Sequence, residues 1–224
     1  KVLHPVDGKP MLHHVIQLAE SIGSKKIVPI IGYQHERVEK SMQEFNLNCV
    51  VQEDQLGTGH AVMQSEHLLG SFDGTILVLS GDVPLLRKSS IQLLLDMYEK
   101  ENAGAALLTA SMDDPTGYGR IIRNESNHFA KIVEHKDCIE EELNVNEINA
   151  GIYLFDAQLL FKSLRMIKND NSQNEYYLPD VLPHFITFGE IVALQLMTDS
   201  TEIMGINTVE QLEEINRIYK QRKK

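Results

Sequence analysis

The sequence T-I-L-V-L-S at residues 75–80, continued by G-D-V-P-L at residues 81–85, decides the predicted fold. The first run is apolar without alternation, which is typical of a strand buried on both faces of a parallel sheet. Pro84 cannot continue a strand ladder, so Asp82 is expected at the carboxyl edge of this strand. A carboxylate there is well placed to hold Mg²⁺, although an isolated Asp after a strand is as often a turn or capping residue.

Outward from this strand, short apolar runs alternate with amphipathic stretches through the first half of the chain. Strands are expected at residues 26–31, 49–52, 75–80 and 104–112, and helices at residues 10–23, 34–44, 59–69 and 89–101. This alternation predicts βαβ crossovers and an α/β fold with a mostly parallel sheet between helices. Ligands on such sheets lie beyond the carboxyl ends of the strands.

The second half of the chain has a different pattern. Strands are expected at residues 120–123, 130–134 and 148–155, with few helices between them. We therefore expect a smaller antiparallel extension that forms one wall of a cleft. The remaining elements are expected to be helices at 157–166, 179–188 and 209–222, with a strand at 191–197.

Composition excludes several classes of protein. The 224 residues suffice for one large α/β unit, and no apolar run approaches the roughly 20 residues that span a bilayer. A net charge of -11 argues against nucleic acid as a partner, because binding a phosphate backbone requires a clustered basic surface. Cys49 and Cys138 lack metal-ligand spacing, so we expect two reduced thiols in a cytoplasmic protein.

A second candidate site is the sequence Q-E-D-Q-L-G-T-G-H-A at residues 52–61, where two glycines join a strand to a helix. Glycine lets a ligand approach the backbone closely and leaves amide groups free to bond it. Gln52 carries both an amide donor and an acceptor, the combination needed to recognise the edge of a uracil ring. The plain alternative is a helix-start loop with Thr58 as its cap.

Four polar or glycine positions of the second half are further candidates. Gly119 ends the sequence T-G-Y-G, whose glycines suit a turn as well as a close ligand. Glu134 lies near a strand end, where a carboxylate can accept sugar hydroxyls or simply belong to a solvated face. Asn149 lies inside an apolar strand and must find partners, of which a ligand is one candidate. Asn207 precedes the last helix, for which Thr208 is an equally good cap.

Taken together in this order, these segments resemble the N-terminal uridyltransferase domain of the GlmU family, the bifunctional N-acetylglucosamine-1-phosphate uridyltransferase/glucosamine-1-phosphate acetyltransferases. The matching segments are K-V-L-H from residue 1, Q-L-G-T-G-H-A from 55, G-D-V-P-L from 81, D-P-T-G-Y-G-R from 114, V-E-H-K-D from 133, E-I-N-A-G from 147, E-Y-Y-L-P-D from 175 and G-I-N from 205. They span nearly the whole chain. The collinear set is specific, whereas each segment alone is weak. The resemblance implies a Rossmann-like nucleotidyltransferase fold.

The resemblance also implies roles for individual residues. Asp82 and Asn207 would be the Mg²⁺ ligands, and Lys1 would lie against the phosphates, so that Lys1 and Asp82 are the expected catalytic residues. The nucleotide would be contacted by Gln52, Gly57 and Thr58, with Ser80 and Gly81 beside its ribose. The amino-sugar would be held by Gly119, Glu134 and Asn149.

The implied reaction joins UTP to N-acetylglucosamine-1-phosphate and releases pyrophosphate, as a step toward peptidoglycan and lipopolysaccharide precursors. Residues 1–207 would form the uridyltransferase domain, and residues 208–224 a helix leading to an absent acetyltransferase domain. The family's glycine-rich loop, L-A-A-G-x-G-T-R-M, would lie just before Lys1, so a protein that began at Lys1 is expected to bind UTP poorly. The chain alone is expected to be a monomer and its parent protein a homotrimer.

Two alternatives remain open from the sequence. One keeps the class of enzyme and changes the sugar-1-phosphate or the base, because fold alone does not fix specificity. The other is a sugar-nucleotide-binding fragment without activity.

Overall fold

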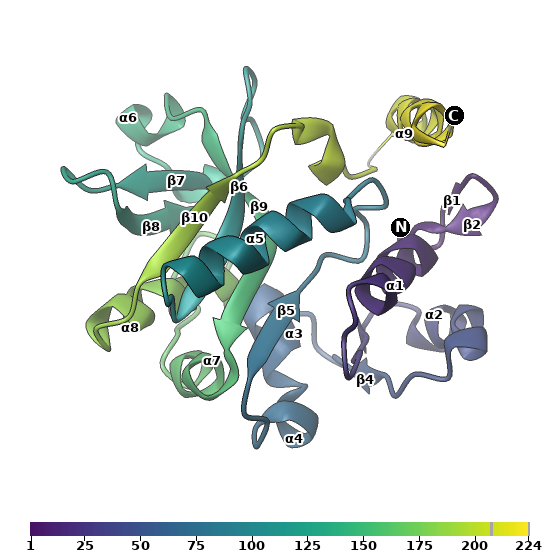
Figure 1. Ribbon diagram of the computed structural model, residues 1–224, viewed down its shortest axis with the longest axis horizontal. Helices are drawn as coiled ribbons and strands as arrows, with labels where there is room; N and C mark the ends of the chain where they lie inside the picture. Colours follow the sequence, from purple (N-terminus) through teal and green to yellow (C-terminus); the bar gives the residue numbers. More distant parts are fainter. Residues whose placement is uncertain (207, 224) are drawn as a thin grey trace.

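The computed structural model describes residues 1–206 and 208–223 (Figure 1). Its strands are β1 (Pro5–Val6), β2 (Lys9–Pro10), β3 (Ile30–Ile31), β4 (Val50–Val51), β5 (Thr75–Val78), β6 (Ala105–Ser111), β7 (Arg120–Arg123), β8 (Phe129–Val133), β9 (Glu147–Asp156) and β10 (Val192–Leu196). Its α-helices are α1 (Met11–Ser21), α2 (His35–Ser41), α3 (Thr58–Met63), α4 (Glu66–Leu69), α5 (Lys88–Lys100), α6 (Glu140–Leu143), α7 (Ala157–Leu164), α8 (Leu182–Thr187) and α9 (Val209–Arg222). Short 3₁₀ helices are η1 (Gln43–Phe45), η2 (His135–Asp137), η3 (Leu178–Val181) and η4 (Ser200–Ile203).

The central sheet of the described residues has six strands. Five follow the order β10-β6-β9-β7-β8, and β5 pairs with β9 beside them. β10 and β6 are parallel, whereas β9 runs antiparallel to β5, β6 and β7. β5, β6 and β10 therefore share one direction, with β9 inserted against it. Two of the three strands predicted for the antiparallel extension form it as β7 and β8, which pair antiparallel at the end of the sheet. The third, expected at residues 148–155, is instead β9 in the middle of the central sheet.

The α/β class is confirmed, but the predicted mostly parallel sheet requires a correction. Residues 75–80 were expected to form a buried parallel strand, yet β5 ends at Val78 and pairs antiparallel with β9. Its apolar run has another cause: Ile76 and Val78 pack into the core on one face, and Leu77 packs into the core on the other. Burial on two faces removes alternation whatever the direction of the neighbouring strand.

Helices cover both faces of the sheet. Along β6, Ala105 and Leu107 point to a core that includes Leu182 and Phe185 of α8. Ala106 and Leu108 point to the core beneath α5. Figure 1 shows α5 lying across the sheet, and α7 and α8 lie near its lower end. This alternation between successive residues follows from the two-residue period of a strand.

An irregularity interrupts the pairing of β6 with β9. Leu107 faces Tyr153 and Thr109 faces Asn149, so residues 150–152 of β9 stand opposite Leu108 alone. Gly151 has a φ of +73°, which an L side chain rarely adopts. This bulge lies at the middle of the sheet and shapes the candidate site described below.

The chain's first elements and its last helix gather on one side of the sheet. β3 and β4 form a separate parallel pair, where α1 and α2 bury Ile16, Ile31 and Val38 together. α9 packs on the β1–β2 hairpin through Ile215 and Val6, and Figure 1 shows these elements side by side. Thr208 caps α9, because its hydroxyl accepts the Gln211 amide hydrogen at 3.2 Å.

Most predicted elements are present with shifted ends. Residues 120–123 and 209–222 match β7 and α9, but the strand expected at 26–31 shrinks to two residues because β4 offers β3 only two partners. The helix expected at 59–69 divides into α3 and α4. Cys49 and Cys138 are free thiols, as expected. Within the described ranges, no helix is long and apolar enough to cross a membrane.

Candidate functional site

Lys1 and Asp82 meet beyond the carboxyl end of β5. The Lys1 Nζ lies 2.7 Å from Asp82 Oδ2, and the two side chains are 42% and 27% exposed. A Cβ atom at Gly205 would lie 3.6 Å from Asp82 Oδ2 and 3.7 Å from Lys1 Nζ, so the chain passes beside the pair there. We call Lys1, Asp82 and Gly205 the Asp82 cluster. Its ammonium and its carboxylate both remain accessible to a ligand.

Asn207, the second predicted metal ligand, lies outside the described residues. In the described part of the chain, no three His, Cys, Asp or Glu side chains gather as a metal site. Among the described residues near Lys1 and Gly205, Asp82 therefore supplies the carboxylate to which a cation could bind. A single carboxylate suits Mg²⁺, which keeps several waters and takes its remaining ligands from phosphate oxygens.

Gln52 and Gly57 on the loop after β4, and Thr58 at the start of α3, are brought together. Gln52 is buried, its Nε2 donates to the Gly57 carbonyl at 3.1 Å, and the same nitrogen lies 3.0 Å from His60 Nδ1. Gly57 has a φ of +107°, and a Cβ there would lie 2.6 Å from the Tyr176 carbonyl oxygen. Only glycine fits this conformation and this close approach.

The alternative role considered for Thr58, a helix cap, is wrong. The N-cap of α3 is Gly57, and the Thr58 hydroxyl instead accepts the Leu178 amide hydrogen at 2.9 Å. The Gly59 amide also donates to the Tyr176 carbonyl at 2.7 Å. These hydrogen bonds hold the glycine-containing loop against residues 176–178.

Gly119, Glu134 and Asn149 form a second group with Tyr153 and Asp180, which we call the Glu134 cluster. A Cβ at Gly119 would lie 3.1 Å from Glu134 Oε1, and the Gly119 carbonyl accepts the Asn149 amide hydrogen at 2.9 Å. Asn149 Nδ2 donates to the Tyr153 hydroxyl at 2.6 Å, and Asn149 Oδ1 accepts the Gly151 amide hydrogen. The half-buried Asn149 side chain therefore finds partners within its own strand.

Carboxylates of the Glu134 cluster hold their protons unusually well. Burial raises the pKa of Glu134, and the nearby charges of Asp180, Asp137 and Glu175 raise it further. Burial and the charge of Asp137 raise the pKa of Asp180 to about 6. The pKa of the Tyr153 hydroxyl is also raised, chiefly by burial. This part of the site therefore presents oxygens that can form hydrogen bonds and that lose their protons less readily than usual.

The Asp82 and Glu134 clusters adjoin through the bulge in β9. A Cβ at Gly151 would lie 3.4 Å from the Ser80 hydroxyl, so the segment after β5 meets β9 two residues from Asn149. Burial raises the pKa of Tyr118, and the charge of Asp82 raises it further, which places Tyr118 near the Asp82 cluster. Ser80, which was predicted beside a ribose, therefore lies between the two groups.

Arg120 holds the loop that ends at Gly119. The guanidinium is buried, and its Nη1 donates to the carbonyls of Pro115 (2.7 Å) and Tyr118, while Nη2 lies 3.4 Å from His135 Nδ1. Arg120 is the last residue of a quoted motif, D-P-T-G-Y-G-R, but the sequence offered no signal that its charge points inward. Tyr153 and Asp180 were likewise not predicted. Tyr153 bonds to Asn149 only four residues away, but nothing in its apolar strand marks it. The carboxylate that acts on Asp180 is Asp137, which is distant in the chain.

Comparison with known families places the chain among the enzymes that transfer nucleotidyl groups. The profile of the nucleotidyl transferase family matches residues 1–221. The chain therefore belongs to the nucleotidyl transferase family.

Within that family the chain is similar to the bifunctional protein GlmU. It is 46% identical to GlmU of Bacillus licheniformis over 222 residues, which cover 99% of this chain and 48% of that protein. It is 44% identical to GlmU of Halalkalibacterium halodurans, with 99% of this chain and 49% of that protein covered. The chain thus spans about half the length of these relatives.

Solved structures confirm the class of fold. The chain is similar to a UDP-glucose pyrophosphorylase complexed with UDP-glucose, with a TM-score of 0.75, 18% identity, and 99% and 90% of the two chains covered. It is also similar to a putative glucose-1-phosphate thymidylyltransferase from Bacillus anthracis in complex with sucrose, with a TM-score of 0.70, 21% identity, and 97% and 85% covered. The predicted Rossmann-like nucleotidyltransferase fold is therefore confirmed.

Proposed function

We propose that this chain transfers the uridylyl group of UTP to N-acetylglucosamine-1-phosphate, giving UDP-N-acetylglucosamine and pyrophosphate. The observation that carries the proposal is that two groups adjoin: the Asp82 cluster, a cation and carboxylate suited to phosphates, and the Glu134 cluster, a set of oxygens suited to hydroxyl groups. The 46% identity to GlmU supports this choice of substrates.

The proposed chemistry is an in-line displacement at phosphorus. A phosphate oxygen of the sugar phosphate attacks the α-phosphorus of UTP, and the electron pair of the breaking P–O bond leaves with pyrophosphate. No general base is needed, because a phosphomonoester has a second pKa of about 6 and is already a dianion at neutral pH. The obstacle is repulsion between two anions. The Lys1 ammonium, 42% exposed, lowers that repulsion by lying against the phosphates.

Asp82 and Asn207 would hold Mg²⁺ in this proposal. The Asp82 carboxylate fits the ion, because it is accessible and its counter-charge is a single flexible Lys1 side chain that can move to a phosphate. When bound, Mg²⁺ supplies positive charge that stabilises the oxygens of the α-phosphoryl group. Asp82 then orients the phosphates relative to the sugar phosphate, with Gly81 and Ser80 beside the ribose.

The proposed roles on the substrate side follow the two remaining groups. Gln52 recognises the uracil edge, with Gly57 and Thr58 shaping the loop around the nucleotide. Glu134 in its ionised form accepts hydrogen bonds from the sugar hydroxyls, and Asn149 and the Gly119 backbone complete the contacts with the amino-sugar. The raised pKa of Glu134 means that this acceptor is lost at a higher pH than an ordinary Glu would lose it.

We further propose a cellular setting for this activity. Residues 1–207 act as a cytoplasmic uridyltransferase domain that serves cell-wall precursor synthesis, without nucleic acid or membrane as a partner. Residues 208–224 lead toward an acetyltransferase domain through which the parent protein forms a homotrimer, while this chain alone is a monomer. The similarity to relatives of about twice this length supports the proposal.

The test combines binding with turnover. Calorimetry should detect binding of UDP-N-acetylglucosamine, and a pyrophosphate-release assay should detect turnover with UTP and N-acetylglucosamine-1-phosphate. Both are carried out on this chain and on a version extended at the N-terminus by the glycine-rich loop. Faster turnover with glucose-1-phosphate or another nucleotide would redirect the specificity. Binding of the product without turnover in either version would identify a binding module.

A further inference from the structure

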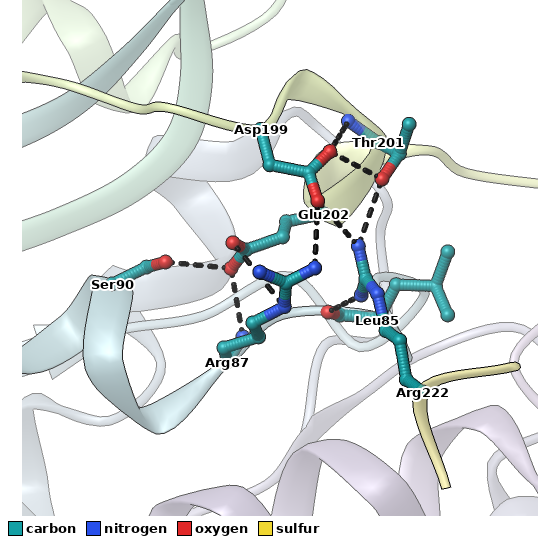
Figure 2. A network of polar contacts seen from close by, with 7 residues as sticks. All are labelled: Leu85, Arg87, Ser90, Asp199, Thr201, Glu202 and Arg222. Carbon is teal, nitrogen blue, oxygen red and sulfur yellow. Dashed lines mark hydrogen bonds and ion pairs between the residues drawn. The ribbon is translucent and has the colours of Figure 1, made fainter. Parts of the chain in front are cut away.

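A buried carboxylate joins the loop after Asp82 to the segment that leads to Asn207. Glu202, on η4, is 1% exposed and accepts hydrogen bonds from the Arg87 backbone amide at 2.9 Å and the Ser90 hydroxyl at 2.7 Å. The Arg87 Nε lies 3.7 Å from its other oxygen. Figure 2 shows these groups converging on Glu202 from the start of α5. A buried carboxylate is stable only when paired and hydrogen-bonded in this way.

A second set of contacts adds the last turn of α9 to the same loop. Arg222 Nη1 donates to the Leu85 carbonyl at 2.7 Å, and Nη2 donates to Asp199 Oδ2 at 2.9 Å and to the Thr201 hydroxyl at 2.8 Å. Asp199 also accepts Arg87 Nη2 at 2.7 Å. We call all seven side chains and backbone groups drawn in Figure 2 the Glu202 network: Leu85, Arg87, Ser90, Asp199, Thr201, Glu202 and Arg222.

Residues of the Glu202 network lie close in sequence to two members of the Asp82 cluster. Leu85 and Arg87 follow Asp82 within one short loop, while Glu202 precedes Gly205, beside which Asp82 Oδ2 lies. The same loop and segment also share an apolar core, where Leu85 and Ile206 are buried with Ile215 of α9. Three segments far apart in sequence are thereby fixed relative to the Asp82 carboxylate.

We propose that Glu202 is a positioning residue for the metal site, assisted by Arg222. By fixing residues 85–87 against residues 199–205, it sets the position of the Asp82 carboxylate relative to Gly205, beside which that carboxylate lies. This inference rests on the proposed function, since it assigns a metal to Asp82. Glu202 is buried and bound to the chain itself, so it acts through Asp82 and touches no substrate. Partners that orient metal ligands commonly change metal affinity 10–100-fold.

The test measures metal binding directly. Mn²⁺, used as the probe, is titrated by electron paramagnetic resonance into the protein alone and with UDP-N-acetylglucosamine. Glu202→Gln keeps the shape and removes the charge, while Arg222→Gln releases Leu85 and Asp199. Arg217→Gln is the matched control, because Arg217 lies on the same helix and pairs with Glu214 on the surface. Hydrogen exchange of the Arg87 amide reports whether the network has opened.

Glu202→Gln is expected to raise the Mn²⁺ dissociation constant by about tenfold, and Arg222→Gln by about threefold, with faster exchange at Arg87. The KM for the sugar phosphate should change by less than about twofold, whereas a general loss of structure would weaken every ligand equally. Two results would overturn the proposal. One is an unchanged Mn²⁺ affinity in a folded variant whose Arg87 amide exchanges faster. The other is an equal loss of affinity for every ligand. If Glu202→Gln does not fold, Ser90→Ala and Arg222→Gln are read by the same criteria.

The measurement also separates this proposal from the proposed function. Mn²⁺ titration needs no turnover, so an unmodified protein that binds Mn²⁺ but makes no UDP-N-acetylglucosamine contradicts the substrates alone. An unmodified protein that binds no Mn²⁺, with or without the sugar nucleotide, overturns the positioning role as well.

Discussion

The Asp82 and Glu134 clusters differ in how their charges are balanced. At the Asp82 cluster a carboxylate meets an ammonium at 2.7 Å, and the Glu202 network behind it pairs its carboxylates with arginines. At the Glu134 cluster, burial raises the pKa of both Glu134 and Asp180. The charge of Asp180 raises the pKa of Glu134 further, and the charge of Asp137 raises both. Balanced charges suit phosphates and a metal ion, while crowded carboxylates suit the uncharged, hydroxyl-rich part of a ligand.

Asp82→Ala should break the comparison at its most sensitive point. Removing the carboxylate should lower turnover at saturating Mg²⁺ by about 1,000-fold, because the charge that offsets phosphate repulsion is no longer anchored. Pyrophosphate release measures the rate in the chain extended by the glycine-rich loop. Asp73→Ala, at an exposed Asp just before β5, serves as the control and should be near normal. A near-normal rate for Asp82→Ala would contradict its assignment.

Glu134→Ala should separate the two clusters by substrate. The KM for N-acetylglucosamine-1-phosphate should rise by about 30-fold, as expected for the loss of a charged hydrogen-bond acceptor, while the KM for UTP should change by less than about twofold. Steady-state kinetics with each substrate varied in turn measures the split. Glu125→Ala, in the exposed turn between β7 and β8, is the matched control. Equal losses for both substrates would place Glu134 outside the sugar site.

Gly119→Ala should sharpen the geometry of the Glu134 cluster. The added methyl would lie 3.0 Å from Ile132 Cγ2 and 3.1 Å from Glu134 Oε1, so the carboxylate must move. We expect the KM for the sugar phosphate to rise by about tenfold, an effect of about 1.4 kcal/mol. A double-mutant cycle with Glu134→Ala tests the cause, because residues in contact are not additive. Additive effects would show that Gly119 acts independently of Glu134.

Asp180→Asn should have the smallest effect, and the effect should be on the free energy of unfolding. Because the pKa of Asp180 is raised to about 6, the ionised carboxylate opposes folding above that pH. The variant should be more stable at pH 8 by about 1 kcal/mol, after allowance for partial exposure. Thermal unfolding should show this gain shrinking as pH falls through 6 and vanishing near pH 4, where folded and unfolded chains are both protonated. Asp113→Asn, at an exposed Asp, is the control. A gain independent of pH would contradict the cause.

Local signals in the sequence predicted where helices and strands lie better than they predicted which strands pair with each other. Thr208 before an amphipathic run indicates the start of α9, and the helix begins at Val209 as predicted. The direction of β5 relative to its neighbour was not predictable from its own residues. Its apolar pattern indicates only that both faces of the strand are covered, and it says nothing about which strand lies beside it. That neighbour is β9, about 75 residues away along the chain, whose register pairs Val78 with Tyr153.

The candidate site was predictable where a residue stands at a strand end or a glycine loop. Asp82 was found from its position after an apolar strand, and the structure places Lys1 beside it. The Glu202 network was not found, because Glu202 bonds to Arg87 and Ser90 across more than a hundred residues. No local period or motif marks a buried carboxylate whose partners are that distant.

Because of the bulge in β9, the number of residues between Asn149 and Tyr153 determines whether their side chains meet, just as the identity of these residues does. Residues 150–152 occupy the space opposite Leu108, and they separate Asn149 from Tyr153 by four positions, so both side chains meet. A deletion of one residue there would reverse the parity of the strand and turn Asn149 toward the face now occupied by Ile148. Homologues that differ in length between Asn149 and Tyr153 should therefore lose the contact between these two side chains, even if every other residue of the Glu134 cluster is the same.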